Sequence, residues 1–237
     1  MRYAQNSEYF GRLRKMSKQY QFIIIFKMKK ITIPYINQSG NTFPFYDFPT
    51  PVAIDITPWS NDSDIPTIHF AITHDNTHIY IRYTVQENSI IAKATANNGA
   101  VWKDSCVEFF IMPEKDDVFY NFEINCIGVK LLYAGKTRNN RTPADDATMG
   151  KILTESTLGH QPFDEKFGLF DWTMTVVIPV SCFFQHTIKS VKGKTCLANF
   201  YKCGDELTKP HYLCWNNIET PKPDFHTPQY FGEIVFV

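Results

Sequence analysis

Alternation of apolar and polar residues is the dominant pattern along the chain. In the stretch THIYIRYTVQ, residues 77–86, apolar side chains such as Ile79 and Ile81 occupy every second position, and PTIHFAIT, residues 66–73, alternates in the same way. A period of two residues places successive side chains on opposite faces of a β-strand. The pattern therefore predicts two strands, and the pair Asp75-Asn76 between them suits the tight turn of a hairpin.

Strand-like runs recur through the rest of the chain, and no stretch shows a long apolar period of 3.6 residues. Residues 135–168 are polar and rich in turn-forming residues, which predicts a long surface loop. Many short strands separated by polar, turn-forming residues are typical of two packed sheets. We therefore expect an all-β, antiparallel, jelly-roll-like β-sandwich in a single domain. The further strands are expected at 105–112, 118–127, 172–178, 196–203 and 230–236.

The N-terminal part carries a short apolar run, QFIIIFK at 21–27, that is bracketed by lysines. This run is shorter than the core of a secretory signal and far shorter than a membrane span. Met28 then opens MKKITIPYI, a second natural start. We therefore expect residues 1–27 to be an extension and 28–237 to be the domain, with no membrane span and with a cytoplasmic location favoured.

Charge and composition narrow the function classes. The chain has 24 Lys and Arg residues against 24 Asp and Glu, so its formal net charge is zero. A protein that binds nucleic acid through the phosphate backbone needs a basic surface, so we expect no nucleic-acid partner. Aromatic residues make up 15% of the chain and charged residues only 20%, which favours a packed fold over disorder.

The cysteines show no metal-binding spacing. No CxxC pair occurs, so a zinc site has little support from the sequence. Most of the cysteines stand inside apolar, strand-like runs, where buried free thiols are common. We expect buried free thiols at Cys106, Cys126, Cys182, Cys196, Cys203 and Cys214.

A polar stripe runs along one face of the strand expected at 118–127. In VFYNFEINCI, Asn121, Glu123 and Asn125 alternate with apolar residues, and in SCVEFFIM at 105–112 Glu108 shares a face with Cys106. Amides and carboxylates can donate and accept hydrogen bonds with the hydroxyls of a sugar. The solvated outer face of an antiparallel sheet gives the same pattern, so the stripe alone leaves both interpretations open.

The tryptophans favour a binding platform. A sugar ring can pack its C–H face on an aromatic plane while its hydroxyls bond to polar neighbours. Trp102 and Trp215 both stand beside polar clusters, whereas Trp172 alternates with apolar residues and is expected in the core; Trp59 fits either role. On one straight strand Trp102 and Glu108 would be roughly 20 Å apart. They can share a ligand only if residues 103–105 form a bend.

Four motifs resemble the carbohydrate-binding modules of family 9, in the subgroup of Bacteroidetes type: WKDSCVEFF, YNFEINCIG, NFYKCGD with PHYLCW, and PDFHTPQYFG. The likeness covers most of residues 30–237. It implies a bacterial β-sandwich protein of polysaccharide utilisation and carbohydrate catabolism that holds a saccharide end between two tryptophans. Trp102 resembles the first of these and Trp215 the second. Glu108 resembles a ligand-contacting glutamate, and Asn125, Tyr201 and Lys202 lie on strands that supply further contacts.

Two points qualify this resemblance. Glu123 stands where the sugar-binding modules have an arginine, which changes the hydroxyls or charged groups that the site accepts. Members of the family also hold structural calcium. The stretch NDSD at 61–64 offers closely spaced oxygen ligands, although a plain turn gives the same sequence. Apart from this calcium, no cofactor is expected.

Three functions follow as alternatives. The first is non-catalytic carbohydrate binding at Trp102, Glu108, Glu123, Asn125, Tyr201, Lys202 and Trp215. The second is a glycoside-processing enzyme that uses Glu108 and Glu123 as paired carboxylates. The third is a protein–protein module that has lost its ligand. Nucleophilic catalysis by Cys203 with His211 has weaker support than a buried structural thiol, because nothing in the sequence orients the pair.

Overall fold

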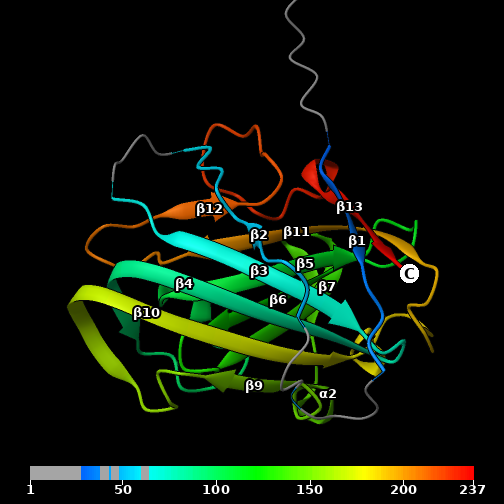
Figure 1. Cartoon of the computed structure of the whole chain (residues 1–237), viewed down its shortest axis with the longest axis horizontal. Helices are drawn as coiled ribbons and strands as arrows, with labels where there is room; N and C mark the ends of the chain where they lie inside the picture. Colours follow the sequence, from blue (N-terminus) through cyan, green and yellow to red (C-terminus); the bar gives the residue numbers. More distant parts are fainter. Residues whose placement is uncertain (1–27, 38–42, 44–47, 60–63) are drawn as a thin grey trace, which may run out of the picture.

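The computed structural model describes residues 28–37, 43, 48–59 and 64–237. The expected extension, 1–27, and residues 61–63 of the expected calcium-binding stretch lie outside these residues. The described residues form two β-sheets packed face to face, with β3, β4 and β10 in front of β5, β6 and β7 in Figure 1. The β-sandwich is therefore confirmed. No helix in the described part of the chain is long and apolar enough to cross a membrane.

The larger sheet has eight strands in the order β1-β13-β11-β5-β6-β7-β8, with β12 also paired to β11. β1 and β13 run parallel, and the other neighbours in this sheet run antiparallel. Its strands are β1 (Lys30–Ile33), β5 (Cys106–Met112), β6 (Phe119–Asn125), β7 (Lys130–Thr137), β8 (Asn140–Pro143), β11 (Thr195–Cys203), β12 (Tyr212–Cys214) and β13 (Gly232–Phe236).

The smaller sheet has five strands in the order β2-β3-β4-β10-β9. β4 and β10 are its longest strands and form a long antiparallel pair between Phe163↔Ala92 and Pro179↔His78. The strands are β2 (Val52–Ala53), β3 (Thr67–His74), β4 (His78–Ala92), β9 (Leu153–Ser156) and β10 (Phe163–Pro179). Short helical turns connect the strands: η1 (Val101–Lys103), α2 (Asp146–Met149), η2 (Val180–Cys182) and η3 (Pro228–Tyr230).

The core lies between the two sheets and contains the side chains predicted to alternate inward. Phe109 of β5 and Phe122 of β6 are buried there, on the faces opposite Glu108 and Glu123. Phe70 of β3 and Phe200 of β11 stack across the interface with ring centroids 3.7 Å apart. Trp172 is also buried in this core, as predicted. The two-residue period therefore assigned the inner faces of these strands correctly.

The hairpin between β3 and β4 has the predicted turn. The Oδ1 atom of Asp75 accepts hydrogen bonds from the backbone N–H of Thr77 at 2.8 Å and of His78 at 2.6 Å. Asn76 has φ of 79°, a left-handed conformation that asparagine adopts more readily than most residues. All six cysteines are buried free thiols, as predicted.

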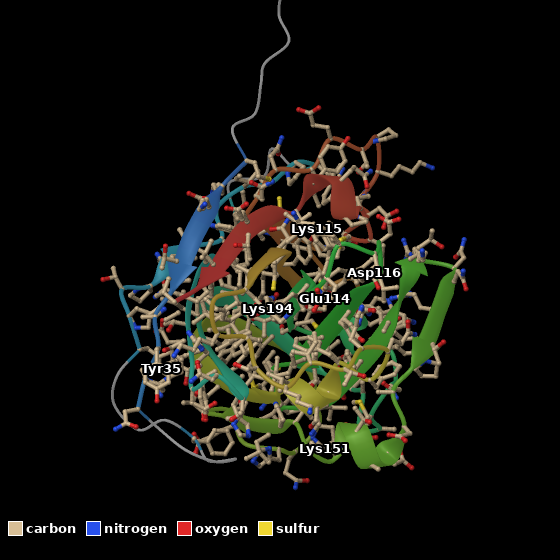
Figure 2. The ribbon with its side chains drawn as sticks, turned by 90° about the vertical axis from the view of Figure 1, so that its right-hand side faces the viewer. Tyr35, Glu114, Lys115, Asp116, Lys151 and Lys194 are labelled. Carbon is tan, nitrogen blue, oxygen red and sulfur yellow. The ribbon has the colours of Figure 1, made fainter. Side chains whose placement is uncertain are left out.

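The long loop predicted for 135–168 is wrong. This region contains the end of β7, then β8, α2 and β9, and the start of β10. β8 and β9 are edge strands, so both have solvent on one side and carry polar residues that resemble a loop in sequence. Asp145 caps α2 by accepting from the N–H of Thr148 at 2.8 Å, and Lys151 marks the end of this turn in Figure 2.

The turn between β5 and β6 is tied to the start of β11. Lys194 Nζ and Glu114 Oε1 form an ion pair of 2.6 Å there, and both residues are labelled on the face shown in Figure 2. Because β11 also pairs along β5, the contact joins two neighbouring strands at the end remote from Trp102 and Cys203. The strands β5, β6 and β11 thus form the central part of the larger sheet.

Candidate binding pocket

A pocket of about 220 Å³ lies on the outer face of the larger sheet. Its floor comes from β5, β6, β7 and β11, on the faces that point away from the core. Its walls come from η1, from the start of β12 and from residues 223–226. Segments that are distant in sequence therefore converge on one cavity.

Glu108 and Glu123 form the acidic part of the floor. They are directly opposite each other on β5 and β6 and are 2% and 4% exposed. The side chain of Asn121 donates to Glu123 Oε1 at 2.7 Å, and the Cys203 thiol donates to Glu108 Oε1 at 3.1 Å. Burial raises the pKa of both carboxyls, that of Glu108 well above its usual range and that of Glu123 to about 7. The floor thus offers a protonated carboxyl at Glu108 and, at Glu123, one that titrates near neutral pH; a protonated carboxyl donates as well as accepts hydrogen bonds.

Trp102 forms one wall because the chain bends after it. The carboxylate of Asp104 accepts from the backbone N–H groups of Lys93 and Ala94, each at 2.9 Å. Asn125 Nδ2 donates to Asp104 at 2.8 Å, which ties the bend to the end of β6. The bend required for Trp102 and Glu108 to share a site is therefore present, and both line the pocket.

Asn125 supports the pocket and does not line it. Its Nδ2 donates to Asp104 and to the Ala94 carbonyl, and its Oδ1 accepts from the N–H of Val129 at 2.9 Å. Both polar atoms of this amide are therefore engaged in holding the loops. The residue positions the turn that carries Trp102.

Tyr212 and Phe225 form the other aromatic wall. The ring of Phe225 stacks on Tyr201 with centroids 4.1 Å apart and an angle of 5° between the planes. The Tyr201 hydroxyl also donates to the Phe225 carbonyl at 3.2 Å, and Tyr201 itself is fully buried. Tyr201 therefore acts behind the wall, where it fixes the orientation of Phe225. Trp59 packs against both Tyr212 and Phe225 from outside the pocket.

Two arginines reach the pocket, Arg138 from the turn between β7 and β8 and Arg141 from β8. Arg138 Nη1 lies 3.7 Å from Asp224 Oδ1, and Arg141 Nη1 lies 2.6 Å from His226 Nε2. Burial lowers the pKa of His226, so the imidazole is neutral and accepts from the guanidinium. The Arg141 guanidinium also lies over the Tyr133 ring, 5.3 Å from its centroid. This side of the pocket thus combines donors with aromatic surface.

Lys202 and Trp215 lie on the inner face of the larger sheet. Lys202 is fully buried and its ammonium pairs with Glu87 of β4 at 2.8 Å. Trp215 is 1% exposed and meets Phe70 and Phe200 edge to face at 6.1 and 5.7 Å between centroids. The structure therefore brings Trp102, Glu108 and Glu123 together in the pocket, and does not bring Lys202 or Trp215 to it.

Several pocket residues were missed from the sequence. Arg138 and Arg141 lie in the stretch interpreted as a loop, and the hairpin turn between them was not recognised. Asp224, Phe225 and His226 belong to the motif PDFHTPQYFG, but the sequence alone did not indicate that they line a pocket. Their signal was the cluster of a carboxylate, an aromatic ring and an imidazole in PDFH, a composition that favours a site over a plain connection.

The floor also contains a group of metal-ligating atoms. Cys106, Glu108 and Cys203 each place one ligand atom within 4.8 Å of the others, and all three residues are buried. The spacing of the cysteines gave no sign of this, because the two thiols come from separate strands. Asp64, the one described residue of the NDSD stretch, contacts Asn88 and pairs with Lys209 at 2.7 Å.

Comparisons with known proteins agree on one family. The sequence profile of carbohydrate-binding family 9 matches residues 49–236. A candidate carbohydrate-binding protein from Bacteroides uniformis is 37% identical, with a TM-score of 0.84 over 89% of this chain and 100% of its own. None of the curated proteins matches the chain.

Two more distant structures share the fold. Both are family 9 carbohydrate-binding modules from Caldicellulosiruptor kristjanssonii. The complex with glucose is 15% identical, with a TM-score of 0.52 over 88% of this chain and 96% of its own. The complex with cellotriose is 14% identical, with a TM-score of 0.54 over 88% and 93%.

Proposed function

The chain belongs to carbohydrate-binding family 9, and from this premise we propose that its outer pocket binds the end of a saccharide without cleaving it. One observation carries the proposal. Trp102, Glu108 and Glu123 lie on three separate elements, yet all three line one cavity of about 220 Å³. Aromatic surface beside buried hydrogen-bonding groups is the combination that recognises a ring with one C–H face and many hydroxyls.

In this proposal Trp102 packs on the C–H face of the sugar ring. Tyr212 and Phe225 provide the opposing aromatic surface, the role that the family resemblance had suggested for Trp215. A protonated Glu108 or Glu123 donates one hydrogen bond to a hydroxyl and accepts others. Trp215 serves the core instead, where its ring meets both Phe70 and Phe200 edge to face.

Arg138 and Arg141 provide the cationic donors that Glu123 cannot. The family resemblance had placed an arginine at position 123, on the floor of the pocket. Here the two guanidinium groups enter from the β7–β8 hairpin, Arg138 from its turn and Arg141 from β8. A saccharide would therefore meet carboxyls below and guanidinium groups at the side. We infer that the positions of the hydroxyls recognised differ from those in modules with an arginine on the floor.

Glycoside cleavage has less support. A hydrolase places its two carboxyl groups on either side of the scissile bond, roughly 5–10 Å apart. Glu108 and Glu123 are cross-strand partners that rise side by side from one floor. Both would therefore contact the same side of a ligand, which suits hydrogen bonding better than acid–base chemistry on a glycosidic bond.

The test is a calorimetric titration of the full chain with mono- and oligosaccharides. Glucose and cellotriose come first, followed by xylose, galactose and uronic acids. We expect binding to at least one of them, and Trp102→Ala should weaken it by about 10-fold or more because an apolar stacking surface of this size contributes roughly 1.5–3 kcal/mol. Phe167→Ala is the matched control, since Phe167 is 70% exposed and lies outside this pocket.

The enzymatic alternative is tested in the same samples. Glu108→Gln keeps the shape of the side chain and removes its acid, so it should weaken binding modestly. Incubation of the wild-type protein with cellotriose should release no reducing sugar. Release of reducing sugar that disappears in Glu108→Gln would establish hydrolysis, and an absence of binding across the whole panel would refute the saccharide proposal.

A further inference from the structure

Cys106, Glu108 and Cys203 converge on the pocket floor from two neighbouring strands. Cys106 and Cys203 are direct cross-strand partners, and Glu108 lies two residues along β5 from Cys106, on the same face. One ligand atom of each lies within 4.8 Å of the other two. We propose that these three residues bind a thiophilic divalent cation of the zinc class, with two thiolates and one carboxylate as its ligands.

The geometry of the cluster suits such an ion. Zinc lies about 2.3 Å from thiolate sulfur and about 2.0–2.2 Å from carboxylate oxygen, so two sulfur ligands of a tetrahedral site lie about 3.8 Å apart. The separations in the cluster are at most 4.8 Å, and Cys203 Sγ is already 3.1 Å from Glu108 Oε1. Small side-chain movements would complete the set. Two sulfur ligands favour zinc over calcium or magnesium, which prefer oxygen.

In the described part of the chain, no cationic side chain competes with a metal ion for Glu108. Among the described residues, no lysine or arginine lies within ion-pair distance of Glu108. Burial raises the pKa of Cys106 to about 12 and that of Cys203 well above its usual value, so both thiols hold their protons without an ion. Binding of the cation would displace these protons into solution. Proton release is therefore a signature of the site.

The pocket gives the ion a path and leaves one position open. Glu108 and Cys203 both line the cavity, so an ion can reach them from solvent. Three protein ligands and one open position are typical of zinc sites that contact a substrate or water. Here the open position would face the space above the floor. A bound ion would offer this open position to a sugar hydroxyl or to a water molecule. The metal site itself does not depend on saccharide binding.

Cobalt provides the direct test, because Co²⁺ replaces Zn²⁺ in tetrahedral sites and absorbs light. The full chain is reduced, freed of metal with a chelator and titrated with Co²⁺ in the absence of sugar. We expect one equivalent to bind, with the near-ultraviolet charge-transfer band of cobalt thiolate, and Zn²⁺ should abolish the band by competition. Since no sugar is present, failure here leaves the saccharide proposal intact.

Variants identify the ligands. Cys203→Ser should lower the Co²⁺ affinity by at least about 10-fold, because loss of an outer-shell partner alone costs 10–100-fold. Glu108→Gln should lower the affinity but keep the charge-transfer band, since both thiolates remain. Cys196→Ser is the matched control: it removes another buried thiol of β11 that bonds the Pro113 carbonyl, and should leave the titration unchanged.

A second measurement uses only the wild-type protein and does not depend on a variant folding. Calorimetric titration with Zn²⁺ in two buffers of different ionisation enthalpy should report the release of about three protons per ion, one from each thiol and one from the Glu108 carboxyl. The absence of a charge-transfer band, an equal band in Cys203→Ser, or a Cys106–Cys203 disulfide in the native protein would each overturn the proposal.

Discussion

Lys202 and Cys203 are neighbours in β11, yet their side chains enter two different buried polar clusters on opposite faces of the larger sheet. On the inner face, the Lys202 ammonium meets Glu87 at 2.8 Å, the His211 imidazole at 2.9 Å and the Cys203 carbonyl at 3.0 Å. Trp172 Nε1 donates to the other oxygen of Glu87 at 2.8 Å. The ammonium thus has two hydrogen-bond acceptors, and the Glu87 carboxylate has its cation.

The outer cluster lacks this match. Glu108, Glu123 and the thiol of Cys203 gather at the pocket floor, and among the described residues neither glutamate forms an ion pair. Both clusters are equally buried, so burial does not distinguish a structural polar group from one that awaits a ligand. The comparison teaches that the balance of charge within a buried cluster is the more useful criterion.

Lys202→Met tests the inner cluster and should have the largest effect. It leaves Glu87 buried without its cation, and removing one partner of a buried pair costs about 3–5 kcal/mol in the free energy of unfolding. Chemical denaturation measures the loss. Lys189→Met, at an exposed lysine, is the control. If Lys202→Met is as stable as the control, the inner cluster does not stabilise the fold.

The double variant Lys202→Met/Glu87→Gln sharpens this test. It removes both charges, so the penalty of an unpaired carboxylate disappears and part of the lost stability should return. No recovery would mean that packing of the lysine stem, and not its charge, accounts for the loss.

Trp215→Phe tests whether Trp215 serves the inner face or the binding pocket. Its expected effect on stability is smaller than that of Lys202→Met. Trp215 is packed on the inner face so closely that a Cβ at Gly232 would lie 2.5 Å from its ring. A smaller ring leaves a cavity that should lower the free energy of unfolding by about 2 kcal/mol. The affinity for saccharide should be unchanged in the folded protein. A loss of affinity without a loss of stability would return Trp215 to the binding site.

The pH dependence of stability provides the finest test. Burial and then the charge of Lys202 lower the pKa of His211 well below its usual value, so the folded state keeps this imidazole neutral. As the pH falls below about 6.5, the unfolded chain takes up a proton at His211 that the folded state does not, so stability decreases.

Comparison with His211→Gln isolates this contribution, because the other titrating groups are common to both proteins. Between pH 6.5 and 5.5 the wild-type protein should lose up to about 1 kcal/mol relative to the variant. Thermal or chemical unfolding across this range measures the difference. If the free energy of unfolding depends on pH in the same way in both proteins, His211 takes up its proton equally in the folded and unfolded states. That result would place His211 outside the inner cluster.

Much of the fold could be predicted because strand periodicity is local. The turn at Asp75-Asn76 and the inward faces of β5 and β6 follow from residues adjacent in sequence. The edge strands β8 and β9 could not be predicted in this way, since their exposed positions carry the same residues as loops. Their identity depends on the neighbours that pair with them, and those are remote in the chain.

The site was predicted in part for the same reason. The alternation places Glu108 and Glu123 on the outer face, but whether that face meets solvent or forms a pocket depends on the segments that cover it. Trp215 shows the limit of local reasoning. The polar residue beside it, Asn216, suggested an open surface, yet its amide bonds the N–H of Lys29 and the Tyr230 carbonyl at 2.8 Å each. Buried amides with satisfied bonds resemble surface amides in sequence.

One edge of β11 pairs with two later strands, and this arrangement has a consequence for synthesis of the protein. β12 pairs with one end of this edge and β13 with the other, while β1 pairs in parallel with β13. β1 therefore leaves the ribosome long before its partner exists, and one edge of β11 stays unpaired until residues 212–236 follow. A nascent chain in this state exposes strand edges that can join those of another chain. We expect the protein to complete its larger sheet only after translation of β13.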